Sequence, residues 1–210
     1  MIRTHKPRRI IEVGSGYSTY VSARASLTNL QHEGHETAFY AIEPFPNDTL
    51  KRGFPGLSLL IQEPVQDVDL GLFQQLEEND ILFIDSTHSV RTGGDVLTEY
   101  LEILPRLRKG VLVHIHDVFL PRDYPMKWTL TLRWVFAEQY LLQAFLCFNK
   151  AFEIVWASSA MALRHADKLE RTFPHWQGSY SRMPARFKVH MCTLDGRNVW
   201  PSSFWIRKVE

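Results

Sequence analysis

Short apolar runs alternate with longer amphipathic segments over the first three quarters of the chain. Turn residues bound each run, as at Lys109-Gly110 and at Asp85. Such runs are typical of strands buried on both faces of a parallel sheet, and the amphipathic segments are typical of its covering helices. The predicted strands are 9–13, 38–42, 57–61, 81–84, 111–115 and 152–157, and the predicted helices are 18–30, 48–52, 70–76, 94–103 and 130–148. This pattern predicts an α/β fold with a doubly wound, mostly parallel sheet.

The alternation breaks down after residue 157. A helix fits residues 161–171, an irregular stretch follows, and residues 203–208 alternate as in an edge strand. We therefore expect one domain over residues 1–210, with 158–201 as an irregular insertion or lid before the last strand. His175, Trp176 and Tyr180 are its candidate specificity residues. Because the first strand begins near residue 9, either the chain is a fragment or a later segment covers the site.

Composition narrows the function classes. The 210 residues are 45% hydrophobic, enough for a full core, and the net charge of +1 favours no nucleic-acid partner. Two isolated cysteines indicate a reducing compartment without disulfides, and no apolar run approaches the ~18 residues of a membrane span. We therefore expect a soluble, cytoplasmic protein with no membrane partner. A homodimer is compatible with these features.

A glycine turn follows the first strand. Glu12 precedes Gly14-Ser15-Gly16, and a helical segment begins directly afterwards. Glycines at such a turn let the backbone approach a ligand closely, and the helix offers free N–H groups. The dinucleotide fingerprint requires a third glycine, but Thr19 occupies that position. Glu43 ends the second strand, where a carboxylate can accept hydrogen bonds from both ribose hydroxyls, in NAD enzymes as in others. The residues thus predict a nucleotide-like cofactor without deciding which one.

The turn and Glu43 together resemble class I S-adenosylmethionine (SAM)-dependent methyltransferases. Four further segments resemble a bacterial subgroup, the methyltransferase-24-like domain: residues 80–88, 102–117, 138–145 and 203–208. The resemblance implies a seven-stranded sheet with an antiparallel last strand beside the sixth, and SAM over the carboxyl ends of the first strands. It implies that Glu43 holds the ribose, that Gln66 or Asp67 lies near the adenine, and that Asp85 lies by the sulfonium. The implied cofactor-binding set is Glu12, Gly14, Ser15, Gly16, Tyr17, Glu43, Gln66 and Asp85.

Charged and imidazole side chains follow the fourth and fifth predicted strands. Adjacent strand ends place Asp85, His88, His116 and Asp117 on one rim of the sheet, and we expect His114 to be a hydrogen-bonded core residue. One use of the rim is a divalent metal site of Asp85, Asp117 and His116, although Val118 replaces the asparagine of metal-dependent O-methyltransferases. The other use is general-base catalysis by His88 or His116, with Asp85 or Asp117 orienting the ring.

We therefore predict a SAM-dependent methyltransferase that transfers a methyl group to an oxygen of a small or carbohydrate-like acceptor. The loop 120–125 suits a wall of the acceptor site, although its aromatic residues can equally anchor the following helix. The alternatives are a nicotinamide-dependent oxidoreductase and a non-catalytic cofactor-binding protein of the same fold. Thr19 speaks against the oxidoreductase, whereas Val118 leaves the non-catalytic protein open.

Overall fold

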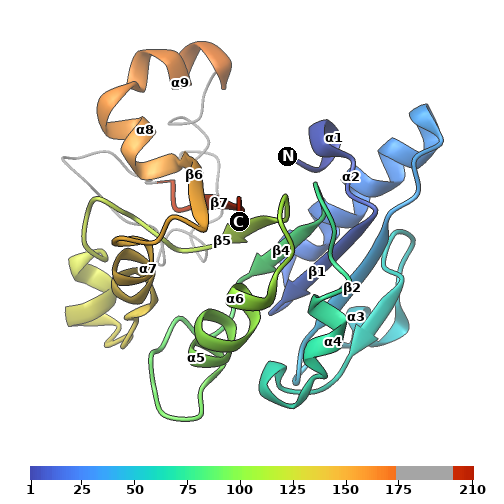
Figure 1. Cartoon of the computed structure of the whole chain (residues 1–210), viewed down its shortest axis with the longest axis horizontal. Coiled ribbons are helices and arrows are strands. Elements are labelled where there is room, and N and C mark those ends of the chain that lie inside the picture. Colours follow the sequence, from blue (N-terminus) through green and yellow to red (C-terminus); the bar gives the residue numbers. More distant parts are fainter. Residues whose placement is uncertain (174–200) are drawn as a thin grey trace.

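The computed structural model describes residues 1–173 and 201–210. Within these residues seven strands form one sheet in the order β3-β2-β1-β4-β5-β7-β6 (Figure 1). Strand β7 is antiparallel to both β5 and β6, and the other pairs are parallel. The strands are β1 (Arg9–Val13), β2 (Ala38–Ile42), β3 (Leu59–Ile61), β4 (Ile81–Ile84), β5 (Leu112–Ile115), β6 (Phe152–Ala157) and β7 (Phe204–Lys208). The expected α/β sheet, with its last strand antiparallel and beside the sixth, is confirmed.

Helices cover both faces of the sheet. One face packs against α1 (Ile2–His5) and α2 (Tyr17–Glu33) through Ile2 and Ala23, and Figure 1 shows both helices on one side of β1. The other face packs against elements that contribute Phe73, Val96, Tyr100, Leu104 and Leu142 to the main core. These elements are α4 (Leu70–Phe73), α5 (Asp95–Thr98), the π-helical turn η2 (Glu99–Ile103), α6 (Leu104–Arg106) and α7 (Glu138–Leu146). The fold is therefore a three-layer sandwich.

The register of the central strands aligns their carboxyl ends. Val13 of β1 lies opposite Ile42 of β2 and Ile84 of β4, and Ile84 lies opposite Ile115 of β5. Each of these residues is the last of its strand. Gly14, Glu43, Asp85 and His116 are the next residues along the chain, so all four lie on one rim of the sheet. This rim holds the candidate site.

The helix expected over residues 130–148 is shorter than the pattern predicts. Residues 127–131 form the π-helical turn η3 (Lys127–Thr131), and α7 starts only at Glu138. Trp128, Trp134 and Phe136 pack with Phe119 and Tyr124 in a separate aromatic cluster. The aromatic spacing reflected this cluster rather than one continuous helical face.

Other elements differ in length. The helix expected over 94–103 is divided into α5 and η2 and continues as α6, and that expected over 70–76 ends at Phe73. The helix expected over 161–171 is two helices, α8 (Ser158–Arg164) and α9 (Ala166–Thr172), because His165 leaves the helical conformation at ψ 40°. The remaining elements are α3 (Asp48–Arg52) and the 3₁₀ turn η1 (Val65–Asp67). His175, Trp176 and Tyr180 lie outside the described residues, so the lid stays a prediction.

Candidate functional site

The glycine turn after β1 permits a close approach between β1 and β4. Gly14 has φ +81°, and a Cβ added there would lie 1.9 Å from the carbonyl oxygen of Asp85. No other residue type fits this position without moving the backbone. At the start of α2, the backbone N–H of Gly16 donates to Thr19 Oγ1 at 3.0 Å. Thr19, which replaces the third glycine of the dinucleotide fingerprint, thus holds the end of the turn.

Glu43 reaches back from the end of β2 to this turn. Its Oε2 accepts hydrogen bonds from the backbone N–H of Ser15 at 3.1 Å and from Ser15 Oγ at 3.3 Å. Its Oε1 accepts one from the Phe45 N–H at 2.8 Å. Oε2 uses both of its acceptor sites on Ser15, whereas Oε1 keeps one free, so the side chain is oriented and still able to accept a hydrogen bond from a hydroxyl group.

A cavity of about 350 Å³ lies over the carboxyl ends of β1, β2 and β4. Four predicted cofactor residues line it: Gly14, Glu43, Gln66 and Asp85. Its size is that of a small-molecule site, and apolar Ile42 and Val65 lie beside polar Gln66 and Thr87. These residues fit a nucleoside. The Glu43 carboxylate suits its sugar, the apolar side chains suit its base, and Gly14 of the turn lines the cavity without a side chain. The residues 12 and 15–17 do not line this cavity.

Glu12 lies beneath the turn. Its side chain is fully buried, its Oε1 accepts a hydrogen bond from Ser18 Oγ at 2.6 Å, and its Oε2 has no partner among the described residues. Burial raises the pKa of the Glu12 carboxyl to about 8. At neutral pH the group is therefore largely protonated, in contrast to a solvent-exposed glutamate.

Beside the cavity, two imidazoles and two carboxylates meet, as expected from the strand ends. Asp85 Oδ1 lies 3.0 Å from His116 Nδ1 and 3.6 Å from His88 Nε2. Asp117 Oδ1 lies 3.3 Å from His116 Nδ1, and its Oδ2 lies 3.8 Å from His88 Nε2. We call Asp85, His88, His116 and Asp117 the rim cluster.

The rim cluster carries compensating charges. Burial disfavours a charge on His88, but hydrogen bonds with Asp85 and Glu138 outweigh it and raise the pKa of His88 to about 10. Burial likewise acts against the ionised form of Asp85, but the two histidines outweigh it and lower the pKa of that carboxyl. The pKa of His116 is raised against its burial by Asp85 and Asp117. In the absence of a bound cation, His88 is thus a cation at neutral pH.

The rim cluster has the donors that a divalent cation needs. Asp85, His88 and His116 each offer one ligand atom, and these atoms lie within 4.8 Å of one another. His116 Nδ1 is buried and 3.0 Å from Asp85 Oδ1, yet it makes no well-aligned hydrogen bond. An unsatisfied buried nitrogen between carboxylates fits a metal ligand. Val118, the residue that stands in place of the asparagine ligand, is buried in the core.

Two residues of the rim cluster have left-handed backbones. His88 has φ 56° and Asp117 has φ 52°. Such conformations are uncommon in residues other than glycine and cost free energy. They persist only where the surrounding structure holds them, and they are concentrated at functional sites. Ser202 Oγ donates to Asp117 Oδ1 at 3.0 Å, which holds that side chain from the segment just before β7.

His114 is hydrogen-bonded within the sheet, as expected, but its side chain is half-buried and borders a cavity beside α2 instead of lying fully in the core. Its ring is stacked between Phe83 and Trp205, with centroids 4.3 Å away on each side, and its Nε2 lies 2.9 Å from Ser203 Oγ. Burial lowers the pKa of His114 to about 3, so the ring stays neutral.

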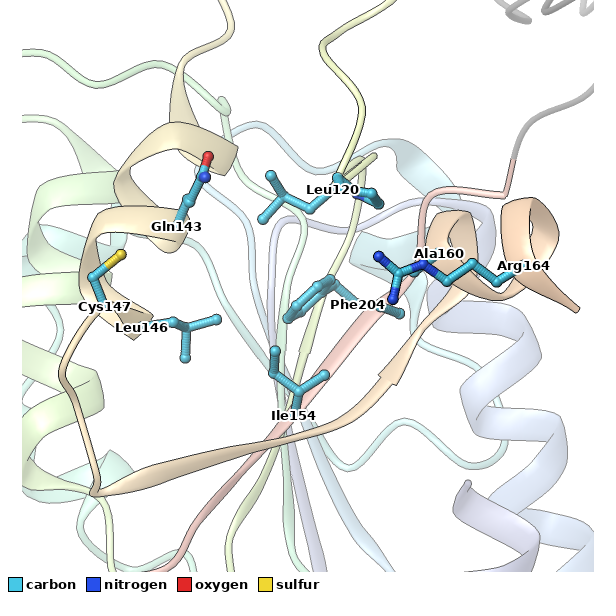
Figure 2. A pocket seen from close by; sticks show the side chains of 10 residues that line it. Leu120, Gln143, Leu146, Cys147, Ile154, Ala160, Arg164 and Phe204 are labelled. Atoms are coloured by element: carbon cyan, nitrogen blue, oxygen red, sulfur yellow. The ribbon is translucent and has the colours of Figure 1, made fainter.

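The loop after β5 has two sides. Tyr124 is buried in the aromatic cluster with Trp128, which supports its anchoring role. On the other side, Leu120 and Pro121 line a second cavity of about 350 Å³. Figure 2 shows the side chains of Leu120, Leu146, Ile154 and Phe204 around this mainly apolar space, with Arg164 at its edge. The anchoring role of the aromatic residues is therefore observed, and the loop as a wall of the acceptor site stays a prediction.

Sequence reasoning missed two buried carboxylates, and the one that contacts the rim cluster is Glu138. Its carboxylate is fully buried, and its Oε2 lies 2.7 Å from His88 Nδ1. One signal was available: Glu138, Leu142 and Phe145 follow helical spacing, so an acidic residue shares the apolar face of α7. Glu99, also fully buried, was missed too, and it accepts a hydrogen bond from Ser86 Oγ at 3.1 Å.

No helix in the described part of the chain combines the length and apolar character that crossing a membrane requires.

A curated relative, an uncharacterized protein from Archaeoglobus fulgidus, is 43% identical over 77 residues, which are 36% of this chain and 34% of that protein. The match thus spans about a third of the relative's length.

Similarities to solved structures are distant. The apo form of CmcI is 12% identical with a TM-score of 0.46, over 100% of this chain and 68% of that chain. CmcI with Mg and SAM is 17% identical with a TM-score of 0.40, over 73% and 60%. The MycE methyltransferase from the mycinamycin biosynthetic pathway, with Mg and SAH, is 16% identical with a TM-score of 0.42, over 100% and 47%. Values this low carry no function over to this chain.

The family comparison is more specific. The profile of the methyltransferase-24 family, described as a methyltransferase domain, matches residues 11–118, just over half of the 210 residues. The matched segment runs from β1 to the residue after Asp117, so it contains the glycine turn, Glu43 and the rim cluster. The chain belongs to this family of methyltransferase domains.

Proposed function

We propose that the protein is a SAM-dependent methyltransferase that methylates an oxygen of a small or carbohydrate-like acceptor. The observation that carries the proposal is the cavity at the carboxyl ends of β1, β2 and β4, lined by Gly14, Glu43, Gln66 and Asp85. In this proposal Glu43 accepts hydrogen bonds from the ribose hydroxyls, Gln66 faces the adenine and Asp85 lies at the methyl end. Glu12, Ser15, Gly16 and Tyr17 complete the cofactor-binding set around the turn. We further propose a cytoplasmic location and a single domain over residues 1–210.

The rim cluster supplies the second half of the proposal. Asp85, His116 and Asp117 would hold a divalent cation, and His88 would act as the base. When bound, such a cation acts as a Lewis acid toward an acceptor hydroxyl, and SAM provides an already activated methyl group. The family match and the convergence of these side chains beside the cavity support a metal site here, and the ligand atoms that lie within 4.8 Å of one another are those of Asp85, His116 and also His88.

The protein itself has three tasks in methyl transfer. It aligns the acceptor oxygen with the methyl carbon and sulfur, excludes water, and removes the hydroxyl proton. His88 Nε2 can take that proton only when the ring is neutral. The neutral form is favoured once the charges of Asp85 and Asp117 are neutralised by a cation, because these carboxylates help to keep His88 protonated.

Calorimetry with SAM and with S-adenosylhomocysteine tests the cofactor assignment. Glu43→Ala should weaken binding roughly 10- to 150-fold, since hydrogen bonds to a charged group contribute ~1.5–3 kcal/mol. Glu36→Ala, the same change at an exposed glutamate, is the matched control and should leave binding unchanged. Thermal unfolding of both variants reports whether the fold persists. Unchanged affinity in folded Glu43→Ala would contradict the assignment.

Titration with Mn²⁺ separates the two uses of the rim cluster. Asp85→Asn and Asp117→Asn should lose Mn²⁺ binding, whereas His88→Gln should keep it and lose transfer of labelled methyl groups from SAM to a panel of hydroxylated compounds. If His88→Gln also loses Mn²⁺ binding, His88 is a ligand and not the base. If none of the variants changes Mn²⁺ binding, the metal site is refuted.

Two other functions make different predictions. A nicotinamide-dependent oxidoreductase would bind NADH with energy transfer from tryptophan, but Thr19 in place of the third glycine does not favour it. A non-catalytic protein of this fold would bind SAM with no dependence on the rim cluster. A thermal-shift screen with SAM, NADH and divalent cations distinguishes these functions by the ligand that stabilises the folded state.

A further inference from the structure

The first turn of α7 meets His88 through its side chain. Glu138 Oε2 lies 2.7 Å from His88 Nδ1, and Glu138 Oε1 accepts a hydrogen bond from the Tyr100 hydroxyl at 3.1 Å. The Glu138 carboxylate is fully buried, as is Tyr100. A buried carboxylate is costly unless its oxygens are hydrogen-bonded, and here each oxygen has one partner. This carboxylate is therefore held in one orientation by the protein around it.

The same turn also holds the backbone of His88. The N–H groups of Ala137 and Glu138 donate to the His88 carbonyl oxygen at 2.8 and 3.2 Å. His88 adopts its left-handed conformation, φ 56°, in this contact. The Phe136 ring packs on the imidazole with centroids 4.8 Å apart. Backbone, ring face and Nδ1 are thus all fixed by residues 136–138.

The next residue of α7 holds the loop that follows Asp117. Gln139 Oε1 accepts from the Phe119 N–H at 3.0 Å, and its Nε2 donates to the Arg122 carbonyl oxygen at 3.1 Å. The backbone N–H of Gln139 donates to the Tyr124 hydroxyl at 3.0 Å. One helical turn therefore connects the loop after β4, which carries His88, with the loop after β5, which carries Asp117.

We propose that Glu138 is a positioning residue that fixes the ring orientation of His88. By accepting a hydrogen bond from Nδ1–H, it leaves Nε2 directed at Asp85 and Asp117, at 3.6 and 3.8 Å. A histidine that serves as a base or a ligand through one nitrogen is oriented by the hydrogen bond at the other. The inference deepens the proposed function and rests on it for its catalytic meaning. The placement of the Nδ1 proton can be tested without any methyl transfer.

Nitrogen NMR of ¹⁵N-histidine-labelled protein tests the placement, with His88→Gln identifying the His88 signals. In the unaltered protein at pH 7 the His88 Nδ1 should carry a proton. Glu138→Leu keeps a similar size but removes the acceptor, so the His88 Nδ1–H should exchange with water and its fixed signal should be lost. Calorimetric SAM affinity should change less than about threefold, since Glu138 does not line the cofactor cavity.

Tyr100→Phe is the matched control, because it removes the other hydrogen bond of the same carboxylate. Both variants should be less stable than the unaltered protein, but Tyr100→Phe should keep the Nδ1–H signal. An unprotonated Nδ1 in the unaltered protein would refute the inference even if Glu138→Leu did not fold. Equal loss of the signal in both variants would reduce Glu138 to a packing role. Absence of methyl transfer with the NMR pattern as expected would reject the proposed function alone.

Discussion

Glu12 offers a direct test of how this fold handles a buried carboxyl group. The side chain is fully buried beneath the glycine turn, and one of its oxygens has no hydrogen-bond partner among the described residues. Burial raises its pKa from 4.5 to about 8, with Asp85 adding to the shift and His116 opposing it. Glu12→Gln keeps the size and the acceptor for Ser18 while removing the ionisation. The variant should therefore lose a pH dependence that the unaltered protein has.

The sign follows from proton binding. Between pH 4.5 and 8 the folded state holds a proton on Glu12 that the unfolded chain has released, so the free energy of unfolding falls as pH rises through this window. The contribution is fully present below pH 4.5 and is lost above about pH 8. Each pKa unit corresponds to about 1.4 kcal/mol, so the loss between pH 6 and pH 9 is ~3 kcal/mol.

Urea unfolding at pH 6, 7, 8 and 9 measures this loss. The difference in free energy of unfolding between Glu12→Gln and the unaltered protein should grow in favour of the variant by ~3 kcal/mol over the range. Glu36→Gln makes the same chemical change at an exposed position and should show no such trend. A pH-independent difference for Glu12→Gln would mean that Glu12 is ionised in the folded protein, and the reasoning would be wrong.

Three further predictions concern the turn, the rim cluster and a helix cap. Gly14→Ala should destabilise the protein by at least ~2 kcal/mol, because φ is +81° and the new Cβ would collide with the Asp85 carbonyl; a smaller loss in urea unfolding would show that the turn is pliable. Mn²⁺ at a hundredfold excess over its Kd should stabilise the protein by about 2.7 kcal/mol, and Asp117→Asn should abolish the thermal shift. Asn47→Ala should lower the free energy of unfolding by about 1 kcal/mol, because Asn47 Oδ1 accepts hydrogen bonds from the N–H groups of Thr49 and Leu50, both at 3.0 Å. An unchanged melting temperature would contradict this capping role.

Much of the site's location could be predicted from the sequence, because parallel strands end at a common edge. The apolar runs at 9–13, 38–42 and 81–84 matched the strands residue for residue. Each is buried from both sides, so its composition alone distinguishes it from the amphipathic helices. The residues that follow these runs then had to share a rim, which brought Gly14, Glu43 and Asp85 to one cavity.

Helix limits around the site depended on contacts that are distant in sequence. The aromatic spacing of residues 130–148 predicted one helix, but α7 starts at Glu138, where the N–H groups of Ala137 and Glu138 donate to the carbonyl oxygen of His88. That partner is about fifty residues away along the chain. Local periodicity reports which side chains face a core, and it contains no information on which distant carbonyl ends or starts a helix.

The sequence by itself therefore determined the sheet, the order of chemistry-bearing residues along it and the rim on which they gather. Only the tertiary structure decided the charge and orientation of those residues. His88 pairs with Glu138, Glu12 is buried beneath the turn instead of lining the cavity, and the pKa values of both groups follow from these surroundings. The physical reason is that strand burial depends on the residue types of the strand itself, whereas desolvation and ion pairing depend on which loops approach each side chain in three dimensions.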